Sequence, residues 1–141
     1  MTDSNCIFCK IVANQIPSRI VFENDEFLCF MDINPVSDGH CLLIPKTHSA
    51  SISEMTNSDA VKLMQLMHRL APVISKSVGA SSFNLITNSG VESGQEVFHT
   101  HFHITPRKEK TKTPWKQSQP SKEHLDSIFE AIKVGVTKAS L

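Results

Sequence analysis

The chain has 141 residues, and its 14 Lys and Arg balance 14 Asp and Glu. A chain of this length is expected to form one domain, and its zero net charge gives no global field to attract nucleic acid or an anionic membrane. No apolar run reaches about 18 residues and no charged-then-apolar leader precedes Cys6, so neither a membrane span nor secretion is predicted, and the expected location is the cytoplasm.

A cysteine pair is the first motif along the chain. Cys6 and Cys9 have Cys-x-x-Cys spacing, which in a chain without a secretion signal suits a metal chelate or a redox pair better than a structural disulfide. Redox use would call for a βαβ context that the surrounding sequence lacks. Alone, the pair would supply only half of a zinc site, so the missing ligands would have to come from far along the chain. Cys29 and Cys41 lie in apolar runs and are expected to be small buried hydrophobes.

Three strands are predicted in the first third of the chain. Residues 20–23 and 27–31 flank Asn24-Asp25-Glu26, which is a hairpin signature, and 41–44 predict a third strand.

A long helix is predicted next. Thr56 is a candidate N-cap, with Asp59 favourably placed in the first turn. Because proline lacks an N–H and clashes with the preceding turn, Pro72 predicts a kink or break near Ala71. The helix has a broad apolar stripe suited to packing on a sheet, formed by Leu63, Leu66, Met67, Leu70 and Ile74.

The segment that follows favours anion binding. Residues 83–88 predict a fourth strand, and 89–96 are small, polar and punctuated by glycine. Gly90 and Gly94 permit backbone conformations that turn N–H groups toward an anion, and Ser93 and Gln95 add side-chain donors. This loop is a candidate phosphate cradle because histidines follow it directly.

Alternating histidines are the most informative feature of the sequence. On a strand, His99, His101 and His103 would share one face, while Phe98, Thr100, Phe102 and Ile104 would share the other and face the core. Three imidazoles on one face indicate a binding site, since each buried neutral ring needs a donor and an acceptor. Two chemistries fit: a His-x-His metal-ligand pair, or a histidine nucleophile flanked by anion-binding imidazoles.

A charged linker followed by a helix is predicted for the last part of the chain. Residues 107–114 are charged without apolar periodicity, which indicates a linker or flexible loop whose basic residues are solvated. Ser121 is a candidate N-cap for a C-terminal amphipathic helix. Its apolar positions are Leu125, Ile128, Phe129, Ile132 and Val136.

The run 93–105 resembles the signature of the histidine triad (HIT) family, with Thr100 and Thr105 as mild departures. Blocks at 6–11, 30–35 and 39–48 add to the resemblance, which covers residues 4–107. It implies an α+β, HIT-like fold, in which helices pack on an antiparallel sheet of about five strands. We expect a single HIT domain over 1–141, with a core at about 4–107, a linker at 108–120 and a helix at 121–138. The family is usually a homodimer in which two sheets join side by side.

The resemblance also implies a nucleotide hydrolase or transferase. One nitrogen of His101 would donate to a backbone carbonyl, and the other would attack the α-phosphate of a purine nucleotide to form a nucleotidyl-histidine. His103, Gln95 and loop N–H groups near Gly94 would contact the phosphate, while His99 supports the array. A nucleoside phosphoramidate, an acyl adenylate and a dinucleoside polyphosphate all remain possible substrates.

Family positions imply further contacts with the substrate. Asp32 and Ile33 would form the ribose and base wall, Asn88 would lie near the phosphate, and His40 would lie beside the triad. At Glu96 several relatives carry a serine that contacts the leaving group. The longer, charged glutamate departs from the family pattern at the leaving-group position.

In one branch of the family, two histidines complete the Cys-x-x-Cys motif. Carried over by motif, the ligands are Cys6, Cys9, His48 and His99, a closed set typical of structural zinc. Such a zinc would fasten the N-terminal segment and hold His99 in place.

Two alternatives remain. One is a non-catalytic nucleotide sensor or scaffold that uses the same cleft. The other is a metal hydrolase with all three histidines on one catalytic zinc, which has no use for the cradle loop and leaves Cys6, Cys9 and His48 unexplained.

Overall fold

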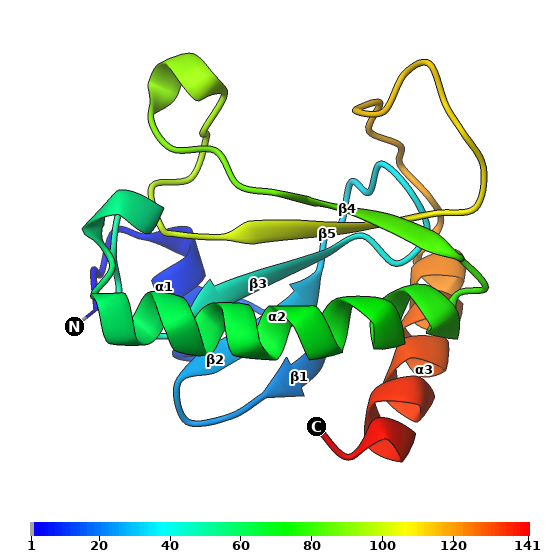
Figure 1. Ribbon diagram of the computed structural model, residues 1–141, viewed down its shortest axis with the longest axis horizontal. Coiled ribbons are helices and arrows are strands. Elements are labelled where there is room, and N and C mark those ends of the chain that lie inside the picture. Colours follow the sequence, from blue (N-terminus) through cyan, green and yellow to red (C-terminus); the bar gives the residue numbers. More distant parts are fainter. Residues whose placement is uncertain (1) are drawn as a thin grey trace.

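The computed structural model describes residues 2–141 and confirms the predicted α+β class (Figure 1). A five-stranded antiparallel sheet has the order β1-β2-β3-β5-β4, and α2 runs along one of its faces. The strands are β1 Ile20–Glu23, β2 Phe27–Met31, β3 Cys41–Pro45, β4 Ser82–Ile86 and β5 Phe102–Arg107. The α-helices are α1 Ile7–Val12, α2 Asn57–Ser77 and α3 Lys122–Ala139, and short 3₁₀ turns span Ile52–Glu54 and Val91–Ser93.

Both faces of the central strands are buried. One face of β2 and β3 packs with α2 and α3 through Met31, Leu43 and other apolar side chains. The opposite face packs against α1, where Phe8 contacts Phe30 edge-on at 5.4 Å between ring centroids. Cys29 is fully buried, as the sequence predicts. Burial on two faces explains why these strands are continuous apolar runs rather than alternating ones.

Local side-chain hydrogen bonds form the predicted hairpin and helix starts. The Asn24 side-chain oxygen accepts the N–H groups of Glu26 and Phe27, at 2.9 and 2.7 Å, which builds the turn between β1 and β2. The hydroxyls of Thr56 and Ser121 each accept the N–H three residues on, at 3.1 Å, which confirms both N-caps.

Of the kink or break predicted near Ala71, the break does not occur: α2 continues through Pro72 to Ser77. Pro72 is exposed, and so is His68, whose carbonyl loses its helical donor. The buried stripe on the other side of α2 is uninterrupted, so packing on the sheet outweighs the loss of one solvent-side hydrogen bond.

The histidine segment joins the sheet later than predicted. β5 begins at Phe102, because continuing its register with β3 would set Thr100 opposite Pro45. Pro45 has no N–H to offer, and its carbonyl lies 2.7 Å from Nε2 of His99. Phe98, predicted to face the core, is 45% exposed, whereas Thr100 is buried. The fourth strand also differs from the predicted 83–88, since β4 ends at Ile86.

None of the helices in residues 2–141 has the length and apolar character that crossing a membrane requires.

Candidate active site and metal centre

The ring of His101 is held by the backbone of the histidine two residues earlier. Nδ1 of His101 lies 2.7 Å from the His99 carbonyl oxygen, so Nδ1 carries the proton and donates it. In the neutral ring, Nε2 then has a free lone pair. Nε2 has no protein hydrogen-bond partner in residues 2–141 and is not sealed from solvent. Phe8 packs edge-on against the same ring at 5.1 Å, which restricts its rotation.

A second pair of imidazoles forms a hydrogen-bonded relay. The N–H of Val36 donates to Nδ1 of His40 at 3.1 Å, so the neutral His40 ring carries its proton on Nε2. That Nε2–H donates to Nδ1 of His103 at 2.9 Å. By the same logic His103 carries its proton on Nε2, and its ring lies beside the His101 ring at 5.1 Å between centroids. The site therefore presents one lone pair, on His101, next to one N–H donor, on His103.

Burial keeps these rings neutral near pH 7. It lowers the pKa of His40 to about 4, and the charge of Arg107 adds to the shift. It lowers the pKa of His103 to about 4 as well, helped by the charge of His40. Burial also lowers the pKa of His101, although its hydrogen bond to the His99 carbonyl opposes the shift. A neutral imidazole is the nucleophilic form, so desolvation favours the chemistry.

A cleft of about 700 Å³ lies on the α1 face of the sheet, a size suited to a small organic ligand. Phe8 and Phe30 supply aromatic walls, and Asp32, Ile33 and Glu96 line it as well. Ile33 is 67% exposed, unusual for its residue type and available to a flat apolar group. One carboxylate oxygen of Asp32 accepts the Asn34 N–H at 2.8 Å, and the other lies 3.7 Å from Nε2 of His40.

The candidate phosphate cradle is a self-contained turn in this structure. Gly90 and Gly94 have φ values of 96° and 97°, which glycine adopts readily. The N–H groups of Ser93 and Gly94 donate within the loop, to the carbonyls of Gly90 and Val91.

The Gln95 amide is also engaged inside the protein. Its Nε2 donates to the carbonyls of Ala50 and Val97, at 2.6 and 3.0 Å, and its Oε1 accepts the Gly90 N–H at 2.8 Å. A buried amide with these partners supports the loop, which differs from the direct phosphate contact expected from the sequence. Asn88 does lie beside the loop, 3.7 Å from where a Cβ on Gly94 would be.

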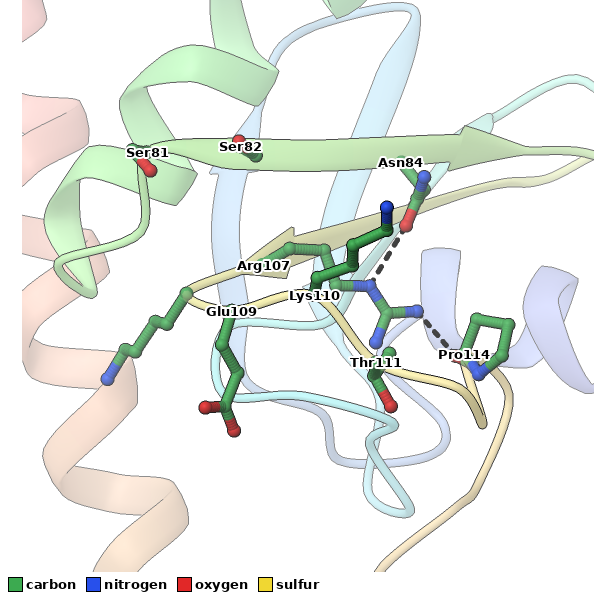
Figure 2. Close-up of a pocket in the computed structure, with 9 residues that line it drawn as sticks. Ser81, Ser82, Asn84, Arg107, Glu109, Lys110, Thr111 and Pro114 are labelled. Atoms are coloured by element: carbon green, nitrogen blue, oxygen red, sulfur yellow. Dashed lines mark hydrogen bonds between the residues drawn. The ribbon is translucent and has the colours of Figure 1, made fainter.

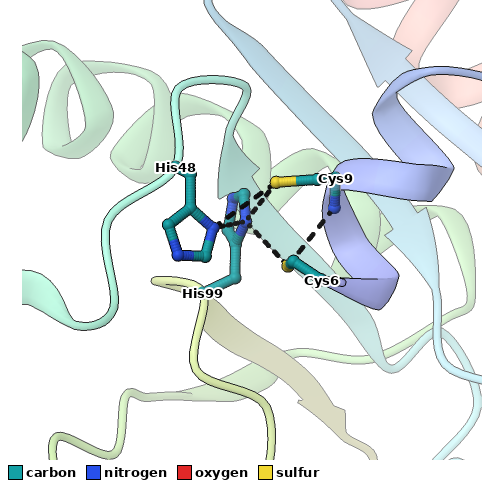
Figure 3. A group of neighbouring side chains, drawn as sticks. All are labelled: Cys6, Cys9, His48 and His99. Carbon is teal, nitrogen blue, oxygen red and sulfur yellow. Dashed lines mark hydrogen bonds between the residues drawn. The ribbon is translucent and has the colours of Figure 1, made fainter. Parts of the chain in front are cut away.

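Two cysteines and two histidines converge in a cluster of Cys6, Cys9, His48 and His99 (Figure 3). Nδ1 of His99 lies 3.4 Å from the Cys6 sulfur and 3.5 Å from the Cys9 sulfur. Nδ1 of His48 lies 3.4 Å from the Cys9 sulfur and 3.2 Å from Nδ1 of His99. The Nε2–H of His99 donates to the Pro45 carbonyl, so its Nδ1 has a lone pair available as a metal ligand.

The geometry of this cluster fits tetrahedral zinc. With typical zinc–ligand bond lengths, a tetrahedron places sulfur and nitrogen ligands about 3.5 Å apart and two nitrogens about 3.3 Å apart. Three of the sulfur–nitrogen separations here are 3.4 to 3.5 Å, the nitrogen–nitrogen separation is 3.2 Å, and all four ligand atoms lie within 4.8 Å of one another. The single lone pair on Nδ1 of His99 can accept only one hydrogen bond, although Cys6, Cys9 and His48 all lie close to it. One cation, in contrast, can be bound by all four side chains at once.

Hydrogen bonds at two places assemble this cluster. The N–H and hydroxyl of Thr100 both donate to the Ser49 carbonyl, at 2.8 and 3.2 Å, which brings His48 beside His99. Cys6 is the N-cap of α1, and its sulfur accepts the Cys9 N–H at 3.4 Å, so one helical turn directs both sulfurs to the same point. This six-residue helix was not predicted, because its only local signal was the motif itself.

Trp115 is a further residue that was not predicted as part of the site, because it lies in the segment expected to be a solvated linker. Its ring meets His103 and His40 edge-on, at centroid distances of 4.8 and 5.4 Å. Nothing in the local sequence pointed to this contact, which joins residues far apart in the chain.

Comparisons with known proteins agree with the sequence resemblance. The HIT domain family model matches residues 13–110. Adenylylsulfatase HINT3 of Arabidopsis thaliana is 41% identical over 107 residues, covering 76% of this chain and 54% of the plant protein. An uncharacterized HIT-like protein of Methanocaldococcus jannaschii is 37% identical over 128 residues, covering 91% of this chain and 98% of its own. The chain thus spans about half of the plant relative and nearly all of the archaeal one.

Solved structures show the same fold. A Hit-like protein from Bartonella henselae superposes with a TM-score of 0.84 at 31% identity, covering 96% of this chain and 99% of the other. A zinc-bound histidine triad family protein from Mycobacterium smegmatis superposes with a TM-score of 0.85 at 26% identity, covering 96% of each chain.

Proposed function

The chain belongs to the histidine triad (HIT) family, and on that premise we propose that it is a nucleotide hydrolase or transferase that cleaves at the α-phosphate through a covalent nucleotide on His101. The observation that carries the proposal is the His101 ring, whose Nδ1 is tied to the His99 carbonyl and whose Nε2 is left free. The cleft beside the triad supports a bound nucleoside.

The proposed reaction has two displacements at phosphorus. The lone pair on Nε2 of His101 attacks the α-phosphorus, and the bond to the leaving group breaks, with the leaving group keeping the bonding electrons and gaining a proton. Water then attacks the same phosphorus and loses a proton, the phosphorus–nitrogen bond breaks, and the nucleoside monophosphate leaves. The lone pair returns to Nε2 of His101.

The neighbouring groups have distinct proposed roles. The Nε2–H of His103 donates to a phosphate oxygen as negative charge builds there, which is the stabilisation that counts most in such transfers. Asp32 and Ile33 hold the ribose and base, and Glu96, which also lines the cleft, contacts the leaving group. Gln95 positions the loop from within, with Asn88 and Gly94 next to the phosphate.

Zinc is proposed as a structural cofactor on Cys6, Cys9, His48 and His99. Four protein ligands leave no open position for substrate, so the ion would supply stability and hold the N-terminal helix to the sheet. Reduced thiols are needed for this, which favours a cytoplasmic location.

We also propose that residues 1–141 act as one domain and pair as a homodimer. β4 is an edge strand, and it leaves Phe83 and Leu85 36% and 37% exposed. An apolar edge of this kind favours pairing with a second sheet. Helix α2 contacts β4 and exposes Val61 and Met64 as well.

The test is a panel of purine nucleotides: adenosine phosphoramidates, an acyl adenylate, a dinucleoside polyphosphate and adenylylsulfate, which is included because of the plant relative. Release of the nucleoside monophosphate by the wild-type protein, and a nucleotide trapped on His101 and identified by peptide mass spectrometry, would support the proposal. Tight nucleotide binding without turnover of any compound would overturn it in favour of a nucleotide sensor.

A further inference from the structure

The one tryptophan of the chain lies against the site rather than in a solvated linker. Trp115 contacts His103 and His40 with ring planes at 83° and 71°, so it meets both rings edge to face. Such contacts fix ring orientation and exclude water from one side of each imidazole. Trp115 is itself 42% exposed, so it covers the histidine pair from the outside.

The chain on both sides of Trp115 is anchored. Arg107, at the end of β5, donates from Nε to the Asn84 side-chain oxygen at 2.9 Å and from Nη2 to the Pro114 carbonyl (Figure 2). One guanidinium therefore joins β4, β5 and the residue before Trp115. On the far side, the N–H and hydroxyl of Ser118 both donate to the Pro35 carbonyl, at 2.9 and 2.8 Å.

These anchors place Trp115 where it can control the relay between His40 and His103. The relay requires one tautomer of each ring. The 2.9 Å hydrogen bond from Nε2 of His40 to Nδ1 of His103 makes the tautomer of His103 depend on that of His40. Rotation of the His103 ring would redirect its Nε2–H. The Trp115 ring restricts that rotation of His103, and the Phe8 ring restricts rotation of His101.

We propose that Trp115 is a positioning residue for His103, and that Arg107 acts through Pro114 to hold Trp115 in place. The catalytic consequence rests on the proposed function, because it concerns the phosphate contact of His103. The positional consequence, a fixed tautomer in the His40–His103 pair, does not depend on turnover.

Nuclear magnetic resonance tests the positional part on the full chain labelled with ¹⁵N-histidine. Long-range ¹H–¹⁵N spectra distinguish the two tautomers of each ring. In the wild type, His40 and His103 should each show the Nε2–H tautomer. Trp115→Ala should produce averaged tautomer signals for His103, Trp115→Phe should restore the fixed form, and the neighbouring control Lys116→Ala should change nothing. An unchanged His103 signature in Trp115→Ala would overturn the proposal.

Kinetics test the catalytic part with whichever panel compound is turned over. Trp115→Ala should lower kcat about tenfold or more while KM changes little, because a small displacement of a catalytic group costs rate rather than binding. Trp115→Phe should recover most of kcat; equal losses in both, or loss in KM alone, would contradict a positioning role. If no compound is turned over even by the wild type, the proposed function fails while the tautomer experiment still decides the role of Trp115.

Arg107→Lys separates charge from geometry. Lysine keeps the positive charge but cannot bridge Asn84 and Pro114 as the planar guanidinium does. We expect the fluorescence of Trp115 to shift toward longer wavelength and to become more open to quenching by acrylamide, with kcat lowered as in Trp115→Ala. Fluorescence and kcat equal to those of the wild type would show that Arg107 does not hold Trp115 in place.

Discussion

Nδ1 of His101 lies 2.7 Å from the carbonyl oxygen of His99, so the backbone of a candidate zinc ligand sets the tautomer of the candidate nucleophile. The His99 ring is fixed at both nitrogens, by the Pro45 carbonyl at Nε2 and by the cysteine–histidine cluster at Nδ1. A disturbance of the metal site therefore reaches the nucleophile through one hydrogen bond. This coupling separates a direct catalytic role from an indirect one in the variants below.

His101→Ala should abolish turnover while nucleotide affinity and fold remain largely intact. Removal of a nucleophile typically costs about a thousandfold or more in rate, and the residues lining the cleft, within the described 2–141, include no imidazole or thiol that could replace it. Steady-state kinetics on the panel compound, with isothermal calorimetry of nucleotide binding, give the comparison. Retention of more than about a tenth of wild-type activity, equivalent to about 1.4 kcal/mol in the barrier, would exclude the covalent mechanism.

The protein should carry about one zinc per chain, and Cys6→Ser or Cys9→Ser should lose it. Loss of the metal should lower Tm by about 10 °C, since binding of a structural ion contributes directly to folding stability. Metal analysis of protein purified without chelator or an immobilised-metal step, followed by calorimetry, provides the readout.

Cys29→Ala is the matched control for the zinc experiment. This thiol is fully buried in the sheet, outside the cysteine–histidine cluster, so its variant should keep the metal. Activity of the Cys6 and Cys9 variants should fall only through the orientation of His99 and His101. A metal-free wild type of full stability would show instead that Cys6 and Cys9 are a reduced thiol pair.

The features that local chemistry determines were predictable from the sequence. Asn24, Thr56 and Ser121 act through hydrogen bonds to residues two or three positions away, and each of them forms the turn or cap expected. The predicted break at Pro72 and the predicted core position of Phe98 were wrong for the opposite reason. Packing of α2 on the sheet and the missing N–H of Pro45 decide these features, and neither effect is visible in a local window.

In the candidate site, too, contacts between distant segments could not be predicted from local patterns. The cluster of Cys6, Cys9, His48 and His99 joins distant segments, and only the family resemblance connected them in advance. Trp115 had no such motif, because its contacts with His40 and His103 depend on how a loop returns over the sheet. The charged, aperiodic sequence around Trp115 therefore gave no indication of a contact that only the folded chain forms.

Stability should fall as the pH drops from about 6.5 to about 4. Burial lowers the pKa of His40 and of His103 to about 4, whereas histidine in an unfolded chain titrates near 6.5. Between these values the unfolded chain binds more protons than the folded one, so each proton taken up favours unfolding. Arg107 adds to the shift at His40, while Asp32 opposes it at His103.

Urea unfolding at a series of pH values measures this dependence. His40→Asn should reduce the slope of unfolding free energy against pH by up to about 1.4 kcal/mol per pH unit, which is the contribution of one proton. Because acid also releases metal from thiolate sites, the comparison is made between two proteins of equal zinc content. Identical slopes in His40→Asn and wild type would show that these rings do not control acid stability.

Leu85→Glu should convert the proposed homodimer to a monomer. Leu85 lies on the edge strand β4, opposite Ile104 of β5, and its 37% exposed side chain belongs to the apolar edge that a second sheet would cover. A charge there would be buried without a partner, which is costly enough to prevent association. Sedimentation equilibrium measures the mass of both proteins. Val134→Glu, on the exposed side of α3, is the control and should leave the dimer intact. A dimer that survives Leu85→Glu but is lost in Val134→Glu would move the interface from β4 to α3, and a monomeric wild type would remove the dimer altogether.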